Sequence, residues 1–562
     1  MCVFSGTVFL SHGRSNALAE HMTASLPHAL GRLLEPEAYP HPVDRVELVT
    51  THISWVLLAG EYAYKIKRPV RYPFVDLTSL ERRRFLCEEE VRLNRRFAPE
   101  LYLDVCRVLT VDGTARMELP HASSPGALAN AERPIEYAVR MRQFSRAEEL
   151  DHLLDGHRAE TGELEAFGRG LAQMHARLPA VLAASSWGKW EEIRAQLLRN
   201  LTECADAAAV FGSLHQGQAV NLRPPLEARL GACASWIAAR RSNGKVRECH
   251  GDLHSRNIVR IRGRLVAFDC LEYDPRLRWI DTADEIAFLS SDLKARGQTL
   301  HAHAFRAGYL AESGDFHACR VLALYEAHRA LVRAKVAALS AAQSGADGAT
   351  DALRREHVRL VNFAGEALAP KAPRLLLMSG VSGSGKTWLA RQLAERLAAV
   401  HIRSDVERKR RAGMRELAPS HSRLGEDLYS AEATVALYDD LTRAAENVLS
   451  GSIPAIVDAT FLERAQRTSF AGLAARCGAS LQLILCEAPE PVLRARITER
   501  SRVGRDPSEA DPGVLAWQLA RLEPPAAGEA MDVIRVDTLR SDALDQTLRK
   551  IGGTLSGAAN QL

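Results

Sequence analysis

A glycine-rich octapeptide carries the most specific chemical signal in the sequence. It reads Gly380, Val381, Ser382, Gly383, Ser384, Gly385, Lys386 and Thr387, and it lies between the apolar run 375–378 and a segment of helical pattern. Glycines let the backbone wrap around an anion, and the amide N–H groups at the start of the helix point at that anion. The Lys386 ammonium suits the β- and γ-phosphates of a nucleotide, and the Thr387 hydroxyl suits Mg²⁺. The eight residues therefore predict a site for ATP with Mg²⁺.

Two carboxylates follow the next predicted strands of the same segment. Asp405 lies just past the strand in HIRSDVERKR, with Arg408 three residues later, and Asp458 ends the apolar strand in SIPAIVDATF. Active sites of open α/β sheets gather at such strand ends, so we expect Asp458 beside the Mg²⁺. The alternative for each aspartate is an N-cap of the following helix.

Basic residues are frequent in the later segment LRARITERSRVGRDPSEAD. It carries Arg494, Arg496, Arg500, Arg502 and Arg505 on a predicted helix and the loop after it. One interpretation is a mobile lid whose arginines, Arg500 among them, meet phosphate charge as the lid closes. The alternative interpretation is a solvated basic helix face.

Together these features resemble the small P-loop kinases of the gluconate kinase, polynucleotide kinase and zeta-toxin type. The resemblance covers about residues 373–525. It implies a phosphoryl transferase in which Asp405 is the base or the orienter of the acceptor hydroxyl. In the same resemblance, Arg408 holds the acceptor.

A second set of chemically suitable residues lies in the N-terminal half. The motif is His250-Gly-Asp252-Leu-His-Ser-Arg-Asn257, and the strand LVAFDC that follows it contains Asp269. Asp252 can accept the proton of an attacking hydroxyl, while Asn257 and Asp269 offer hard oxygen ligands to Mg²⁺. We expect His250 to brace the loop.

A lysine-bearing strand precedes this motif. The segment AYKIK offers Lys65, which fits best as a lysine over the α- and β-phosphates, and Lys67, the alternative on the same strand face. The next helix carries Glu88, Glu89 and Glu90, one of which should pair with that lysine. We prefer Glu89 as the partner. The alternative is a solvated acidic helix face.

The N-terminal set resembles the aminoglycoside and choline kinase group, relatives of protein kinases whose shared loop reads H-G-D-x-x-x-x-N. The resemblance covers about residues 25–340. The sequence departs from protein kinases in having no Gly-x-Gly-x-x-Gly loop and in placing CLEYDP after Asp269, which suits the small-molecule kinase branch. We expect Asp284 or Asp281 to anchor the catalytic loop. The fusion of such a domain to a P-loop kinase domain resembles a bacterial family of bifunctional phosphotransferase/ATP-binding proteins.

The elements that must position these residues follow two patterns. Short alternating β-type runs and one charged helix occupy residues 45–145, and residues 145–340 are mostly helical. After residue 373 the apolar strands alternate with helices, as in a parallel sheet. We therefore predict an α+β kinase-like N-terminal domain with a small β-rich lobe and a large helical lobe. A C-terminal α/β P-loop domain with a parallel sheet follows it.

Domain boundaries are read from shifts in composition. We expect a disordered leader at 1–21, the kinase-like domain at 22–340, a linker and a helix at 341–373, and the P-loop domain at 374–562. The segment SAAQSGADGAT, with its small and polar residues, marks the linker.

Composition limits the class of protein. The chain has 562 residues with 73 basic and 69 acidic side chains, which is nearly neutral, so bulk charge does not favour a nucleic-acid binder. No apolar run reaches the roughly 18–20 residues of a membrane span. The ten cysteines form no C-x-x-C pair and predict buried free thiols in a reducing cytoplasm.

The sequence as a whole predicts an ATP-dependent phosphotransferase with two Mg·ATP sites, acting on hydroxyls of small-molecule acceptors. One rival is a nucleic-acid-end or nucleotide-sugar kinase at the C-terminal site, which the basic run at 407–411 favours weakly. A rival of another class is a regulatory ATP-binding protein. The intact Asp252, Asn257, Asp269 and Lys386 argue against that rival, because a sensor needs no catalytic base. Nothing in the sequence indicates an oligomeric state.

Overall fold

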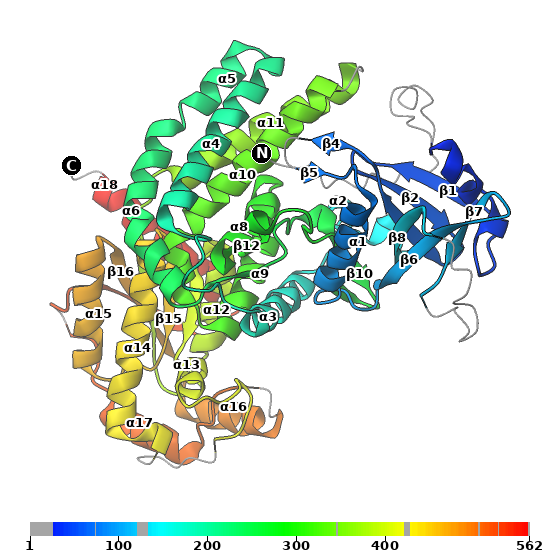
Figure 1. Cartoon of the computed structure of the whole chain (residues 1–562). Coiled ribbons are helices and arrows are strands. Elements are labelled where there is room, and N and C mark those ends of the chain that lie inside the picture. The colour runs from blue at the N-terminus through cyan, green and yellow to red at the C-terminus, as the bar shows by residue number, and fades with distance from the viewer. Residues whose placement is uncertain are drawn as a thin grey trace. The chain divides into compact units, whose positions relative to one another are not determined.

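The computed structural model describes residues 26–72, 75–120, 133–343, 347–420, 427–503, 506–526 and 528–559. The leader expected at 1–21 lies outside the described residues. The chain divides into two compact units (Figure 1). The first takes the chain up to Phe167 together with Gln173–Gln298 and Leu324–Leu368, and the second takes 168–172, Thr299–Ala323 and the chain from Ala369 onwards. Among the described residues, no helix is both long and apolar enough to cross a membrane.

The first unit begins with an antiparallel sheet of order β1-β2-β3-β8-β6-β7. Its strands are β1 (Val46–Thr50), β2 (Ser54–Ala59), β3 (Tyr62–Lys67), β6 (Tyr102–Val111), β7 (Thr114–Glu118) and β8 (Glu136–Arg142), and two short strands, β4 (Arg71–Tyr72) and β5 (Val75–Asp76), pair separately. Helix α1 (Leu80–Asn94) packs on β6 and β8.

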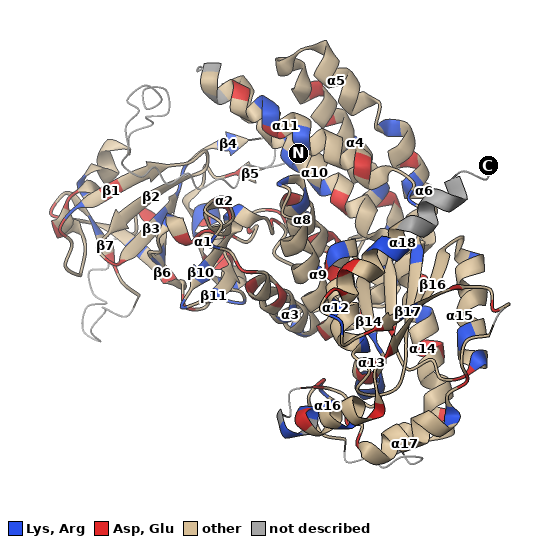
Figure 2. Ribbon diagram, turned by 180° about the vertical axis from the view of Figure 1, so that it is seen from behind, with Lys and Arg blue, Asp and Glu red and all other residues tan. Residues whose placement is uncertain are grey.

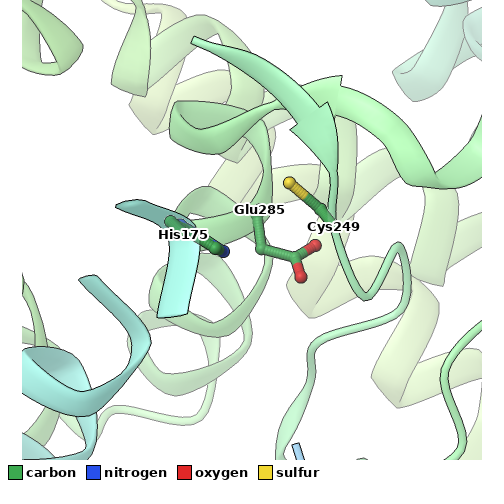
Figure 3. Close-up of side chains that lie close together, drawn as sticks. All are labelled: His175, Cys249 and Glu285. Carbon is green, nitrogen blue, oxygen red and sulfur yellow. The ribbon is translucent and has the colours of Figure 1, made fainter. Parts of the chain in front are cut away.

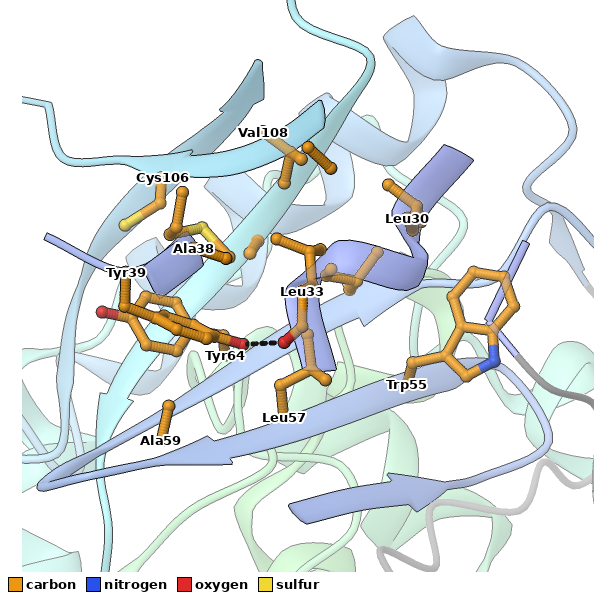
Figure 4. Packing of buried hydrophobic residues seen from close by; sticks show 14 of the residues in the cluster. Leu30, Leu33, Ala38, Tyr39, Trp55, Leu57, Ala59, Tyr64, Cys106 and Val108 are labelled. Carbon is orange, nitrogen blue, oxygen red and sulfur yellow. Dashed lines mark hydrogen bonds between the residues drawn. The ribbon is translucent and has the colours of Figure 1, made fainter. Parts of the chain in front are cut away.

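The alternation of β3 decides which side chains face the site. Tyr64 and Ile66 point to a hydrophobic core that also holds Trp55, Leu33 of the 3₁₀ turn η1 (His28–Leu34) and the short turn η2 (Pro36–Ala38) (Figure 4). Tyr39 seals this core by donating a hydrogen bond to the Leu33 carbonyl at 2.7 Å. Lys65 and Lys67 therefore point to the opposite face, towards α1.

The rest of the first unit is mostly helical and holds two short β ladders. The helices are α2 (Leu150–Asp155), α3 (Thr161–Arg177), α4 (Trp190–Ala208), α5 (Ser213–Val220), α6 (Arg223–Ser242), α7 (Pro275–Arg278), α8 (Thr282–Ala295), α10 (Cys319–Gln343) and α11 (Asp347–Leu368). The ladders pair β9 (Val246–Glu248) with β12 (Trp279–Asp281) and β10 (Ile258–Ile261) with β11 (Arg264–Ala267). The stretch that we interpreted as a linker is helical on both sides of residues 344–346. Figure 2 shows basic and acidic residues side by side on α11.

The second unit is built on a parallel sheet of order β14-β15-β13-β16-β17. Its strands are β13 (Arg374–Ser379), β14 (Val400–Arg403), β15 (Ala455–Asp458), β16 (Ser480–Glu487) and β17 (Asp532–Asp537). Its helices are α9 (Thr299–Ser313), α12 (Lys386–Leu397), α13 (Ser404–Arg411), α14 (Ala431–Ser450), α15 (Arg464–Cys477), α16 (Glu490–Val503), α17 (Pro512–Arg521) and α18 (Ala543–Ala559). The predicted fold class is confirmed: a β-rich lobe with a helical lobe, and a separate domain with a parallel sheet.

Candidate nucleotide-binding sites

Lys65 lies between two carboxylates in the first unit. Its Nζ is 2.8 Å from Glu90 Oε1 on α1 and 2.7 Å from Asp269 Oδ1 after β11. Burial on its own would lower the Lys65 pKa, but the charges of Asp269 and Glu90 outweigh it and raise that pKa well above its usual value. The lysine is therefore a fixed positive charge next to the aspartate that we predicted as a Mg²⁺ ligand.

Lys67, the alternative to Lys65, is enclosed by protein. Its ammonium pairs with Glu90 and with Glu272, and its side chain has no exposed surface. Lys65 instead lines a small pocket with mainly apolar walls, so it is the lysine placed to meet a ligand. Sequence reasoning missed Glu272, although it stands in the CLEYDP segment directly after the predicted metal site.

Glu89 does not pair with the lysine, so our preferred partner was wrong. The Glu89 carboxylate is 2.7 Å from Arg92 Nε and 3.4 Å from an Arg278 nitrogen, and Glu90 takes the position next to Lys65. The reason is helical periodicity.

The inward face of α1 can be read from its apolar residues. Leu86 and Cys87 are buried, and one turn later Glu90 and Val91 are buried as well, while Glu88 binds Arg84 at the surface. Spacing of three and four residues places Glu90 on the buried face. This pattern was present in the sequence and would have separated the three glutamates.

Asp252 and Asn257 face each other in the loop between β9 and β10. Asn257 Nδ2 donates to Asp252 Oδ2 and to the Asp252 carbonyl, each at 3.0 Å. His250 braces the loop as expected, because its Nε2 lies 2.8 Å from the Phe268 carbonyl and its Nδ1 accepts the Asp252 N–H. Burial lowers the His250 pKa to about 4, so the ring is neutral and donates through Nε2.

Asp269 is held in an uncommon backbone conformation. Its φ is +62°, in the left-handed region that residues with a Cβ rarely adopt. The Asp269 N–H donates to the Tyr102 hydroxyl at 3.0 Å, and the next N–H, of Cys270, donates to Asn94 at 2.9 Å. The surrounding lobe fixes this conformation, which aims the carboxylate at Lys65.

The anchors of the catalytic loop differ from those we expected. Asp281 binds Arg240 at 2.8 Å and does not reach the loop. Asp284 acts indirectly, because it holds Arg329, whose guanidinium lies 3.3 Å from the Gly251 carbonyl. Sequence reasoning missed the direct anchor, Glu285.

Glu285 holds the two residues that precede Asp252. One carboxylate oxygen accepts the His250 N–H at 2.6 Å and the other accepts the Gly251 N–H at 3.0 Å. Glu285 lies with His175 and Cys249 in a buried cluster whose ligand atoms are all within 4.8 Å of one another (Figure 3). Burial raises the Glu285 pKa to about 7 and the Cys249 thiol pKa well above its usual value. The thiol is therefore protonated, and the carboxylate serves the backbone of the loop.

The glycine-rich loop of the second unit has the geometry of an anion cradle. Gly380, Gly383 and Gly385 all have positive φ, between +82° and +133°. The Ser382 N–H donates to Gln518 of α17 at 2.7 Å, and the buried Ser384 hydroxyl has no hydrogen-bond partner among the described residues. A buried orphan hydroxyl in such a loop fits a ligand oxygen.

Lys386 begins α12 and turns back on the loop, where its Nζ donates to the Val381 carbonyl at 2.9 Å. Burial lowers its pKa. Asp458, at the end of the neighbouring strand, has a lowered pKa: burial would raise it, but hydrogen bonds from His401 and Thr387 and the Lys386 charge outweigh burial. His401 Nε2 lies 3.1 Å from Asp458 Oδ2. Sequence reasoning missed His401, whose signal was a polar residue inside a short strand.

Asp405 lies in the first turn of α13, and Arg408 lies one turn later. The N-cap of α13 is Arg403 and that of α15 is Glu463, so the capping alternative is wrong for both Asp405 and Asp458. The Arg408 guanidinium lies 4.8 Å from the centre of the Tyr429 ring and donates to the Leu428 carbonyl.

The arginines of α16 divide into two groups. Arg494 and Arg502 pair with glutamates of their own helix at the surface, as in the solvated interpretation. Arg496 lies 3.2 Å from the Gly383 carbonyl of the glycine-rich loop. Arg500 donates to the Ala510 carbonyl at 3.1 Å, and its charge contributes to the lowered pKa of Lys386. Arg505 lies outside the described residues.

The donor sets of both sites fit Mg·ATP. The first unit combines the Lys65 ammonium with oxygen atoms of Asn257 and Asp269, beside a pocket walled by Val56, Leu101, Met141, Phe144 and Phe268. The second combines backbone amides, Lys386, the Thr387 hydroxyl and Asp458. Hard oxygen donors are the ligands that Mg²⁺ prefers, and cations with amides suit phosphate.

Comparison with known proteins agrees with a P-loop domain in the second unit. Residues 375–525 match the family model described as "AAA domain". The chain is 29% identical over 485 residues to uncharacterized proteins of Mycobacterium tuberculosis and Mycobacterium bovis, which covers 85% of this chain and 92% of each relative. The C-terminal domain recognised from the sequence is thereby confirmed.

Similar solved structures include kinases of two kinds. A putative kinase from Chloroflexus aurantiacus has 20% identity and a TM-score of 0.27, covering 34% of this chain and 99% of its own. A gluconokinase from Sinorhizobium meliloti has 20% identity and a TM-score of 0.25, with coverages of 34% and 99%. A choline/ethanolamine kinase family protein from Mesorhizobium loti has 13% identity and a TM-score of 0.31, with coverages of 58% and 93%.

Proposed function

We propose that the protein is an ATP-dependent phosphotransferase with two Mg·ATP sites, each of which phosphorylates a hydroxyl of a small-molecule acceptor. The observation that carries this proposal is the arrangement in the first unit. There, Lys65 is held by Glu90 and Asp269, while Asp252 and Asn257 face each other at 3.0 Å. The glycine-rich loop with Lys386 supports the second site.

In the first unit each group has a separate task. Lys65 binds the α- and β-phosphates, and the apolar pocket beside it binds the base. Asn257 and Asp269 hold Mg²⁺, which neutralises phosphate charge when it is bound. Asp252 orients the acceptor hydroxyl and accepts its proton, and His250 and Glu285 keep Asp252 in position.

In the second unit the glycine-rich loop holds the phosphates through its amides and Lys386. Thr387 and Asp458 hold Mg²⁺, and His401 orients Asp458. Asp405 orients or deprotonates the acceptor hydroxyl, Arg408 binds the acceptor, and Arg500 meets phosphate charge from the α16 side.

A metabolite-pool screen with γ-labelled ATP tests the proposal. We expect the wild-type chain to label small molecules, Asp252→Asn to lose one set of labelled products, and Lys386→Met to lose the other. Arg264→Gln, an exposed change on β11, is the matched control and should keep both sets. A regulatory ATP-binding protein would bind ATP in every variant and label nothing.

A further inference from the structure

Helix α17 of the second unit buries a polar side chain and exposes apolar ones. Its buried residues are Leu515 and Gln518, whereas Trp517 and Leu519 are each 37% exposed. The exposed fraction of Gln518 is only 7%. Burying an amide costs free energy unless the amide is hydrogen-bonded, so an apolar residue would suit this helix face better. The contact that Gln518 makes should therefore explain why the helix buries an amide.

Gln518 contacts the glycine-rich loop. Its side-chain carbonyl accepts the Ser382 N–H at 2.7 Å. Only the oxygen of the amide can accept from an N–H group, so this contact also fixes which way the amide faces. Among the described residues, the N–H groups of Gly383 and Gly385 donate to no backbone carbonyl. Gln518 thus engages one donor of the loop and leaves later donors for an anion.

Helix α16 holds the next residue of the loop. Arg496 donates to the Gly383 carbonyl at 3.2 Å and to the Thr538 hydroxyl at 3.0 Å. The backbone of this helix also lies so close that a Cβ at Gly383 would be 2.7 Å from the Leu493 carbonyl oxygen. Two consecutive loop residues, Ser382 and Gly383, are therefore each held by a side chain from another element.

A hydrophobic cluster joins the same two helices to the loop. Its buried members are Val381 of the loop, Leu493 and Ile497 of α16, Leu515 of α17, and Leu462. Leu515 lies three residues before Gln518, on the same face of α17. The packing that buries Leu515 therefore also places the Gln518 amide against the loop.

We propose that Gln518 is a positioning residue of the second nucleotide site, which holds the glycine-rich loop in its phosphate-binding form before the nucleotide arrives. The proposal rests on the phosphotransferase function proposed above. Gln518 acts through Ser382 and not through a contact with the nucleotide. A loop that has the binding form only part of the time binds its ligand with an affinity reduced by that fraction. Without the Gln518 bond, the loop should have this form less often.

Stopped-flow binding of a fluorescent ATP analogue, mant-ATP, to the full-length chain tests the proposal. The background variant is Asp269→Asn at a Mg²⁺ concentration too low for the first site, so that the signal comes from the second site. We expect Gln518→Met to lower the association rate constant about 3–10-fold, the range for losing one neutral hydrogen bond. The dissociation rate constant should not change, because the bound loop has the same form in both proteins.

The two rate constants separate positioning from other roles. A residue that touches the nucleotide would raise the dissociation rate constant when it is removed. A residue with a merely structural role would lower the melting temperature and leave both rate constants unchanged. Gln392→Met is the matched control, because it makes the same substitution at a half-buried glutamine of α12, and both rate constants should stay at the parent values.

Three outcomes overturn the proposal. They are a raised dissociation rate constant in Gln518→Met, equal association rate constants in Gln518→Met and Gln392→Met, and loss of the folded second unit in both Gln518→Met and Gln518→Leu. Calorimetry measures the last of these. If the parent protein binds no mant-ATP that Lys386→Met abolishes, the proposed function of the second site fails instead, so the two failures are distinguishable.

Discussion

At the scale of single residues, the buried network around Lys65 has an unbalanced charge. Two lysines, Lys65 and Lys67, meet three carboxylates, those of Glu90, Asp269 and Glu272. With all five groups charged the network carries one negative charge in a site that is almost closed to water. A divalent cation held by Asp269, as proposed above, would offset that negative charge.

Glu90 and its neighbour Glu89 give the first prediction. Glu90→Gln removes the carboxylate that both lysines share and should destabilise the first unit by about 3 kcal/mol, the range for breaking a buried pair. It should also raise the Kd for ATP at the N-terminal site at least tenfold. Glu89→Gln, which alters only the contacts to Arg92 and Arg278, should change stability by about 1 kcal/mol or less. Thermal unfolding and ATP titration in the Lys386→Met background measure both effects, and equal losses in the two variants would contradict the assignment.

The second prediction concerns Asp252 and Asp269, because substitution of each should impair a different step. Asp252→Asn cannot accept a proton, so it should bind Mg·ATP normally and lose about 10²–10⁴ in the rate of phosphoryl transfer. Asp269→Asn weakens a metal ligand, so it should need much more Mg²⁺ for ATP to bind, and its residual rate should rise with added Mg²⁺. Labelled-ATP turnover at several Mg²⁺ concentrations separates them. An unchanged rate in Asp252→Asn, or a wild-type Mg²⁺ profile in Asp269→Asn, would contradict the catalytic assignment. Either result would favour a regulatory ATP-binding role for the first unit.

At the scale of elements, the sequence predicted the parts of each site that are contiguous in the chain. The strand, glycine loop and helix around Lys386 are contiguous, and the structure has β13, the loop and α12 in that order. The His250 loop and the strand before Asp269 are local as well. Glu285 and Gln518 were not predictable in this way, because they reach backbone groups 34 to 136 residues away in the chain.

The glycine-rich loop gives the third prediction. A Cβ at Gly383 would lie 2.7 Å from the Leu493 carbonyl, and the φ of +82° adds strain. Gly383→Ala should therefore lower the melting temperature of the second unit by several degrees, at about 2–4 °C per kcal/mol, and abolish ATP binding there. Gly472→Ala on α15 is the matched control, since its nearest contact is an ordinary 3.6 Å from Arg476 and its melting temperature should not fall. Calorimetry with and without Mg·ATP measures both, and similar unfolding of the two variants would argue against a strained loop.

At the scale of the whole molecule, the units do not follow the boundaries of the sequence pattern. Helix α9 precedes the glycine-rich loop by more than sixty residues, yet it groups with the second unit, and Arg306 of this helix donates to the Ala398 carbonyl at 2.6 Å. Composition and periodicity identify an element but not the element on which it packs. The predicted boundary at residue 374 marks the change of pattern, and the packing of α9 required the three-dimensional structure.

Each candidate site takes all of its groups from one unit, and this gives the last prediction. Lys65, Asp252, Asn257 and Asp269 belong to the first unit, and the glycine-rich loop belongs to the second. Lys386→Met removes a cation at the β- and γ-phosphates and should abolish nucleotide turnover at the second site. ATP affinity at the first site should stay within a few-fold of wild type, because no group there is changed.

Isothermal titration of wild type, Lys386→Met and Asp269→Asn tests that independence. At the lowest Mg²⁺ concentration that gives full ATP binding to wild type, we expect about two ATP equivalents for wild type and one for each variant, with the two remaining affinities differing from each other. Lys550→Met is a suitable control because its ammonium lies 3.4 Å from the Arg535 carbonyl at the surface, and it should keep both equivalents. If Lys386→Met alone removes both equivalents, the protein has one nucleotide site or two obligatorily coupled ones, and the assignment of separate phosphotransferase sites falls.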